Sequence, residues 1–118
     1  MDRPTTHQVT LNKLAVGNGR QPLQKMILAS QIKFPLGQIV ITPNALSKLA
    51  SDDILNALNR HVTGDWGDLN KDDKLENDIA LEKGFRLLSA YRSAADIKFW
   101  IITEADRRST YVLLPEDY

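Results

Sequence analysis

The sequence predicts an α+β fold, in which two to three helices pack on an antiparallel sheet whose C-terminal part is a three-stranded meander. Two observations predict this class. Apolar residues recur at helical spacing between residues 43 and 83, and at a period of two from residue 85 onward. Helices that precede a run of strands favour a fold with the helices gathered on one sheet face. A chain of 118 residues is long enough for one core and one domain.

The first part of the chain divides into an arm and the start of a domain. Residues 1–24 show no sustained apolar period and contain two prolines and two glycines, so we expect a flexible N-terminal arm. A single domain is then expected over residues 25–118. Within it, residues 26–34 alternate weakly and suggest a first strand, and the β-branched segment 38–42 (QIVIT) predicts a second.

Three helices are expected in the middle of the chain. Residues 42–43 (Thr-Pro) begin the first with a hydroxyl N-cap and a proline at the first helical position. The polar segment 51–53 recaps the chain, and an apolar stripe continues to Val62. The third helix should span residues 71–83, with Asn70 as its N-cap and a glycine as its stop. Its apolar face is narrow, so this helix should lie on the surface.

The C-terminal part of the chain has the period of a sheet. Segments 85–92, 97–104 and 110–114 are rich in aromatic and β-branched residues. Short polar turns separate these segments, which is typical of strands joined by hairpins. They predict the antiparallel meander.

Composition excludes several classes of protein. The chain has no cysteine, which excludes disulfides and thiolate zinc sites. Its net charge is zero, which argues against tight non-specific binding of duplex DNA. The apolar runs are too short to span a bilayer, so we expect a cytoplasmic protein with no membrane partner. Nucleotide-binding and zinc-protease motifs are absent from the sequence, and we expect neither a cofactor nor a metal.

The segment 61–68 (HVTGDWGD), in which two glycines bracket Asp65 and Trp66, is the first candidate site. Its two glycines permit a tight, defined loop, and such loops often carry binding and chemistry. His61 is a candidate general acid or base, with Asp65 beside it as a second catalytic candidate. Trp66 is a candidate binding residue. The alternatives are structural: His61 is favoured by the negative end of a helix dipole, and Trp66 is a core plug beneath the loop.

A second candidate cluster lies on the predicted meander, where side chains from the strands and their turns could meet in a cleft. Its candidate catalytic residues are Arg86, Ser89, Tyr91, Glu104 and Arg107, and its candidate binding residues are Arg108 and Thr110. Among them, the arginines are suited to the stabilisation of a phosphorane. The alternative is a set of surface ion pairs at the sheet edge, which contribute little free energy.

Through four segments within residues 34–118, the chain resembles a family of small bacterial proteins often encoded on plasmids and other mobile elements. The segments are FPLGQIVITPNAL, RHVTGDWGDLN, RLLSAY and WIITEADRRSTYVLLPEDY. The resemblance implies a bacterial compartment and a mobile genetic setting, and it implies no particular reaction. A fainter resemblance, of layout only, is to the barnase, colicin and RelE group of ribonucleases. Those enzymes use no metal and combine a histidine or glutamate with arginines and hydroxyls.

Two functions follow from these observations. The favoured one is a protein-binding module of a mobile element, which contacts another protein through its sheet edge and the loop around Trp66. A neutral, partly acidic surface suits protein contact better than RNA. The alternative is a metal-independent, toxin-type ribonuclease that cleaves RNA with His61 as general acid or base. The sequence leaves open the identity of the partner and the oligomeric state.

Overall fold

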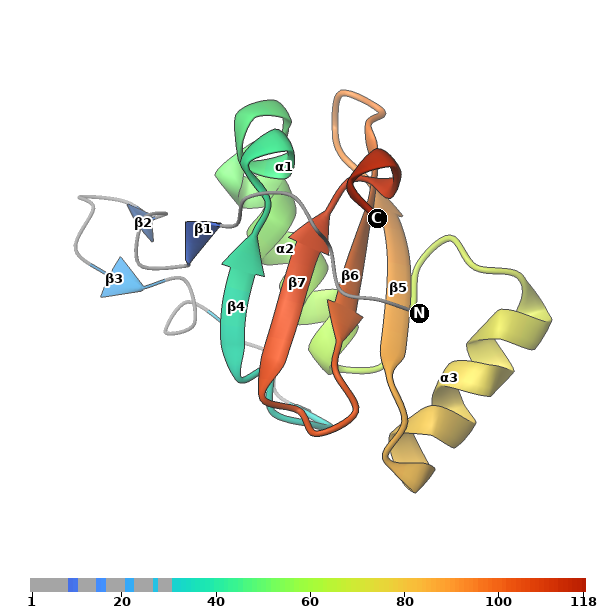
Figure 1. The fold of residues 1–118 in the computed structure, drawn as a ribbon. Helices are drawn as coiled ribbons and strands as arrows, with labels where there is room; N and C mark the ends of the chain where they lie inside the picture. The colour runs from blue at the N-terminus through green and yellow to red at the C-terminus, as the bar shows by residue number, and fades with distance from the viewer. Residues whose placement is uncertain (1–8, 11–14, 17–20, 23–26, 28–30) are drawn as a thin grey trace.

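The computed structural model describes residues 9–10, 15–16, 21–22, 27 and 31–118, which form helices and a mixed sheet (Figure 1). Most of the predicted arm, residues 1–24, lies outside this part of the chain. The helices are α1 (Pro43–Lys48), α2 (Ser51–Val62), α3 (Lys71–Lys83) and the 3-10 helix η3 (Pro115–Asp117). The strands are β1 (Val9–Thr10), β2 (Ala15–Val16), β3 (Gln21–Pro22), β4 (Gln38–Ile41), β5 (Leu87–Arg92), β6 (Lys98–Thr103) and β7 (Ser109–Leu113).

The main sheet has the strand order β1-β4-β7-β6-β5, and β2 pairs with β3 in a separate ribbon. Strands β5, β6 and β7 form the predicted antiparallel meander. Strand β4 pairs with β7 in parallel, so the sheet is mixed rather than antiparallel throughout. The predicted strand over residues 26–34 does not form in its described part, because residues 31–34 are irregular. The predicted α+β class is confirmed.

The ends of the helices follow local chemistry. The Thr42 side chain accepts a hydrogen bond from the Ala45 N–H at the start of α1, and Asn70 caps α3 in the same way. Gly84 ends α3 in the left-handed conformation. The cap of α2 differs from the prediction, because its N-cap is Ala50 and makes no side-chain hydrogen bond. The acidic residues of its first turn favour the helix through its dipole instead.

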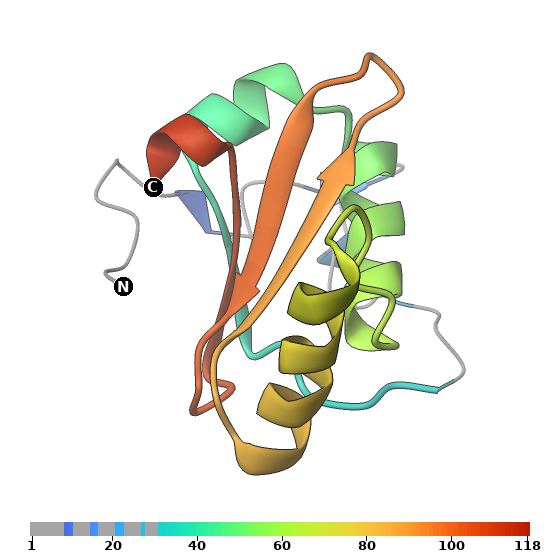
Figure 2. The same cartoon turned by 90° about the vertical axis from the view of Figure 1, so that its right-hand side faces the viewer.

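The helices take different positions around the sheet (Figures 1 and 2). Helix α2 covers one face, whereas α3 runs beside β5 at the sheet edge. The main core lies on the α2 side and includes Ile39, Ile41, Ile54, Leu58, Val62, Leu87, Ile101 and Val112. A smaller cluster of Val40, Ile102, Tyr111 and Leu113 lies on the other face, with Leu88, Trp100 and Tyr118 packed against it. Both faces of the sheet are therefore apolar.

The C-terminal end of the chain is hydrogen-bonded to the start of α1 through Asp117. Its carboxylate accepts hydrogen bonds from Thr42 Oγ1 at 2.6 Å, from Asn44 Nδ2 at 3.0 Å and from the Leu114 N–H at 3.0 Å. Burial opposes ionisation of this carboxyl, but the three hydrogen bonds outweigh it and lower the pKa of Asp117. The last residues of the described chain are thus part of the fold.

Gly67 and Gly84 both have positive φ, but only Gly67 lies close to β5, so substitutions at the two positions test this close contact. Gly67 has φ of +77°, and a Cβ there would lie 2.0 Å from the Ala90 carbonyl oxygen, whereas Gly84 has φ of +78° with open space around it. We expect Gly84→Ala to lower the free energy of unfolding by about 1–2 kcal/mol, which is the cost of the backbone conformation. Gly67→Ala should cost about 3–4 kcal/mol, because overpacking is added.

The measurement is urea denaturation of both variants beside the wild type. Equal losses for the two variants would contradict the close approach of Gly67 to β5.

Candidate functional site

His61, the first candidate of the sequence analysis, lies in the core at the end of α2. Its ring is fully buried, as are the hydroxyl side chains around it. Nδ1 lies 2.6 Å from Ser89 Oγ on β5, and Nε2 lies 2.9 Å from Thr103 Oγ1 on β6. Thr103 Oγ1 lies 2.8 Å from Thr110 Oγ1 on β7, which in turn donates to the Leu36 carbonyl at 2.6 Å. We call these four side chains the His61 chain.

The acceptor at one end of the His61 chain determines the direction of every hydrogen bond in it. The Leu36 carbonyl can only accept, so Thr110 uses its proton there and must accept from Thr103. Thr103 has then used its own proton and must accept from Nε2–H of His61. The remaining nitrogen, Nδ1, accepts from the Ser89 hydroxyl. In the neutral ring, which the lowered pKa of His61 favours, this is the Nε2–H tautomer.

The surroundings of His61 oppose its protonation. Burial, and secondly the positive charge of Arg107, lower its pKa from the usual 6.5 to about 3. Phe34 and Trp66 contact the ring edge-on, with ring centroids 5.2 and 5.7 Å away. A general acid or base must come within hydrogen-bond reach of its substrate. Both nitrogens of His61 are already bound to core hydroxyls, so the geometry favours a structural role.

The loop after His61 packs against β5. The Trp66 ring is buried, and its Nε1–H donates to Asp78 Oδ1 at 2.9 Å. The Trp66 carbonyl accepts from the Ala90 N–H at 3.1 Å, and the Asp68 N–H donates to the Ala90 carbonyl at 2.7 Å. These two hydrogen bonds form a short parallel bridge along the outer side of β5. The ring of Trp66 is thus a plug beneath the loop, as in the structural alternative.

Asp65 is the part of this loop that remains half exposed. Its carboxylate accepts hydrogen bonds from Arg60 Nε at 2.8 Å and from the Gly67 N–H at 3.2 Å. The hydrogen bond from Arg60 is the main cause of its lowered pKa. The Arg60 guanidinium also lies over the Tyr91 ring, 4.7 Å from its centroid, and the Tyr91 hydroxyl donates to the Asp65 carbonyl at 2.6 Å. These contacts hold the loop in place.

The candidate cluster on the meander divides between the two faces of the sheet. Ser89, Tyr91 and Thr110 are buried on the α2 side. Arg86 instead donates to Glu104 at 2.9 Å and to the Tyr118 hydroxyl at 2.8 Å, on the other face. The predicted single cleft therefore does not form from these residues.

The two arginines of the β6–β7 turn have different surroundings. Arg107 donates to the carbonyls of Ala80, Phe85 and Glu104 at 2.7–3.2 Å, so it supports the end of α3. Burial lowers the pKa of the Arg107 guanidinium, which has no carboxylate among these hydrogen-bond partners. Arg108 is exposed. Neither arginine lies with His61 in an open site.

Asn77 makes a contact that sequence reasoning did not identify. Its side-chain amide pairs with the backbone of Leu88 in both directions, so that Nδ2–H donates to the Leu88 carbonyl and Oδ1 accepts its N–H. A side chain on α3 thereby occupies the edge of β5 in the way that a neighbouring strand would. The available signal was an asparagine in the middle of a helix, where its propensity is poor.

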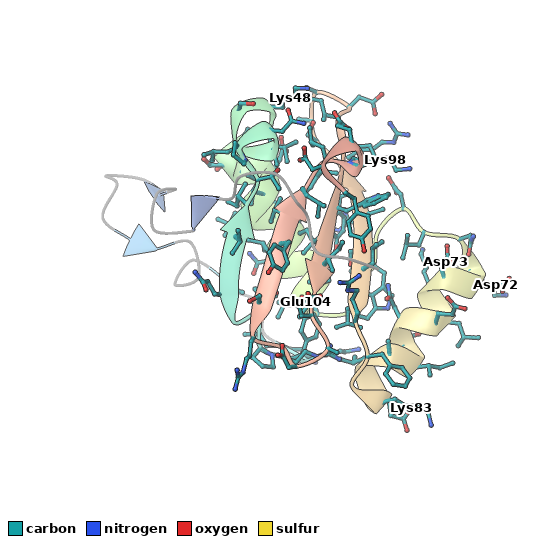
Figure 3. The ribbon with its side chains drawn as sticks, in the orientation of Figure 1. Lys48, Asp72, Asp73, Lys83, Lys98 and Glu104 are labelled. Carbon is teal, nitrogen blue, oxygen red and sulfur yellow. The ribbon has the colours of Figure 1, made fainter. Side chains whose placement is uncertain are left out.

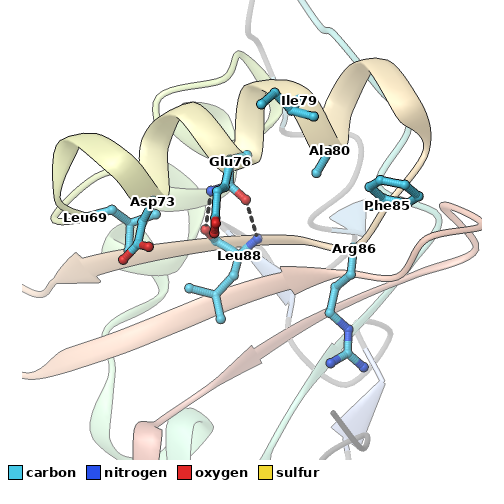
Figure 4. Close-up of a pocket in the computed structure, with 9 residues that line it drawn as sticks. Leu69, Asp73, Glu76, Ile79, Ala80, Phe85, Arg86 and Leu88 are labelled. Carbon is cyan, nitrogen blue, oxygen red and sulfur yellow. Dashed lines mark hydrogen bonds between the residues drawn. The ribbon is translucent and has the colours of Figure 1, made fainter.

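Beside this contact lies a groove between α3 and β5, with a volume of about 690 Å³ (Figure 4). Its walls are formed by Leu69, Asp73, Glu76, Asn77, Ile79, Ala80, Phe85, Arg86 and Leu88. Leu75 and Ile79, whose spacing predicted a surface helix, are 58% and 44% exposed, and Phe85 is 57% exposed. Sequence reasoning placed no site here.

Comparisons with known proteins gave no match, whether the chain was set against family models, curated proteins or solved structures. In the described part of the chain, none of the helices is both long and apolar enough to cross a bilayer. The same residues contain no group of three or more side chains that could hold a metal ion. The site must therefore be interpreted from its own geometry.

The low pKa of His61 predicts how stability depends on pH. Between pH 6.5 and pH 3 the unfolded chain binds a proton at His61 that the folded chain does not, so stability falls as the pH falls. We expect the free energy of unfolding to be about 2 kcal/mol lower at pH 5 than at pH 7. Urea denaturation at both pH values measures this difference.

The control is His61→Gln, which cannot titrate and should lose most of that difference while being less stable at pH 7. Where this variant fails to fold, NMR of the wild type replaces it. A His61 ring whose signals titrate with a midpoint near pH 6.5 would contradict the buried, neutral state.

The direction of the His61 chain predicts a specific tautomer. Nitrogen-15 shifts of the His61 ring should report a protonated Nε2 and an unprotonated Nδ1. Ser89→Ala should leave Nδ1 without a donor and cost about 1–3 kcal/mol of stability, because a buried acceptor becomes unsatisfied. An Nδ1–H tautomer in the wild type would show that the assigned directions are reversed.

Proposed function

We propose that the protein is a protein-binding module, an accessory of a bacterial mobile element, and that it contacts its partner through an apolar patch on α3. The patch consists of Leu75 and Ile79 on α3 and of Phe85, which follows the Gly84 cap, and it is called the α3 patch below. It contains three of the four large hydrophobic residues that are exposed in the described chain, the fourth being Ile32. Leu75 and Ile79 lie about one turn apart on α3, and Ile79 and Phe85 line the same groove. Exposed apolar patches mark interaction sites.

The fold does not require the α3 patch to be apolar. Helix α3 is held to the sheet by Asn77, which pairs with Leu88, and by Ala80, which belongs to the main core. Asp78 adds a hydrogen bond to Trp66, and Gly84 ends the helix. Since these residues supply the helix with its local contacts, large apolar side chains on its outer side are best explained by an external partner.

The sheet edge is a poor surface for such a partner. On β5, the outward groups of Leu88 are bound to Asn77, and those of Ala90 are bound to the loop at Trp66 and Asp68. At the other side of the sheet, β4 is paired with β1. At the β5 edge a partner would therefore meet side chains of α3 rather than add a strand, which differs from the route expected from sequence.

Two further points bear on this proposal. The genetic setting is supported by the resemblance of segments such as FPLGQIVITPNAL and RHVTGDWGDLN to the plasmid-borne family.

The ribonuclease alternative has little geometric support, because His61 is buried with both nitrogens hydrogen-bonded, and Arg107 is hydrogen-bonded to backbone carbonyls. No observation on the described residues favours that alternative over protein binding.

Polar substitution of the α3 patch should abolish binding while leaving the fold intact. In the triple variant Leu75→Gln, Ile79→Gln and Phe85→Gln, we expect the free energy of unfolding to change by less than about 1 kcal/mol, since these side chains are exposed and glutamine is a good helix former. Affinity capture from a bacterial lysate should recover a partner with the wild type and not with the triple variant.

Ile32→Gln is the matched control, because Ile32 is similarly exposed at 55% but lies outside the α3 patch. It should retain the partner. A partner that the triple variant captures as well as the wild type would exclude the α3 patch as the binding surface.

A further inference from the structure

The groove between α3 and β5 has an apolar floor and an acidic rim. Its apolar side chains include Leu69, Ala80 and Leu88, and two residues of the α3 patch, Ile79 and Phe85, also line it. Figure 4 shows Asp73 and Glu76 on the side of α3 that faces β5. A partner that places apolar side chains in this groove would bring its neighbouring residues against two carboxylates.

Two acidic residues, Asp73 and Glu76, and one basic residue, Arg86, line the groove. Asp73 and Glu76 are exposed and form no ion pair with any described residue, so both are available to a partner. Arg86, the basic residue of the lining, is already paired with Glu104 at 2.9 Å. Helix α3 as a whole carries five acidic and three basic residues, with Asp72 and Asp73 at its start and Lys83 at its end (Figure 3). The groove therefore presents negative charge.

The backbone around the groove limits the shape of its occupant. The Asn77 amide already occupies both backbone groups of Leu88, so an extended segment cannot pair with β5 at this point. Recognition must therefore use side chains. An amphipathic helix does this, because it presents apolar side chains on one face while its own backbone hydrogen bonds remain internal.

We infer that the groove receives an amphipathic helix of a partner protein, with basic residues flanking its apolar face. This inference rests on the proposed function and adds the chemistry of the partner. Apolar side chains of the helix fill the space above Leu88 and contact Ile79 and Phe85, and lysine or arginine beside them pairs with Asp73 and Glu76. Complementary charge at the rim mainly gives such a contact its specificity.

The experiment titrates the nitrogen-15-labelled full chain with two designed helical peptides, one of leucine and lysine and one of leucine and glutamate in the same pattern. We expect the lysine peptide to bind and to shift the amide signals of α3 and of residues 85–88. The glutamate peptide should bind at least about tenfold more weakly. Asp73→Asn with Glu76→Gln should weaken binding of the lysine peptide about fivefold, because exposed ion pairs contribute modestly.

The matched control is Asp52→Asn with Glu116→Gln, which removes the same charges from exposed positions outside the groove. It should leave the affinity unchanged. Equal binding of both peptides at the groove would overturn the inference about charge and keep the proposed apolar surface.

Failure of both peptides to shift α3 would overturn the inference and the α3 patch together. A self-associated protein that sedimentation shows to become monomeric on Phe85→Gln would overturn the inferred occupant alone, since a second copy of this chain would then bind at the α3 patch.

Discussion

The hydrogen bonds of His61 are the interaction on which the rest of the structure depends. One imidazole ring, at the last turn of α2, is hydrogen-bonded to Ser89 on β5 and to Thr103 on β6. The His61 chain continues from Thr103 through Thr110 to the segment before β4. Each of these groups is buried, and a buried polar group without a partner costs about 1–3 kcal/mol. The register between α2 and the sheet must therefore satisfy all of them together.

This register also determines how the edge of the sheet is closed. Because α2 ends against β5 and β6, the loop that follows reaches the outer side of β5 and bonds to Ala90. Gly67 permits the approach, since any Cβ there would meet the Ala90 carbonyl. Asn77 of α3 then satisfies Leu88, the next outward-facing position on the same edge. An edge that is satisfied in this way is protected from pairing with another chain.

The same arrangement explains where an interaction surface remains. Arg60, Arg86, Arg107 and Asp117 all have partners within the fold, which makes them structural contacts. Helix α3 packs on the sheet side through Asn77, Ala80 and Leu81, whereas Leu75 and Ile79 are exposed. A closed edge beside an exposed apolar helix supports recognition by side chains over strand addition, and the carboxylates at the rim favour a basic partner.

The features that depend on neighbouring residues could be predicted from the sequence. The N-cap at Thr42, the limits of α3 at Asn70 and Gly84, and the meander all follow from local hydrogen bonding, backbone preference and side-chain alternation. The parallel pairing of β4 with β7 and the division of the predicted cleft between two faces depend on the tertiary structure. So does the environment of His61, whose partners lie 28 and 42 residues away along the chain. A histidine at a helix end has the same local pattern whether it is exposed or buried, and its pKa and chemistry depend on long-range packing that spacing does not encode.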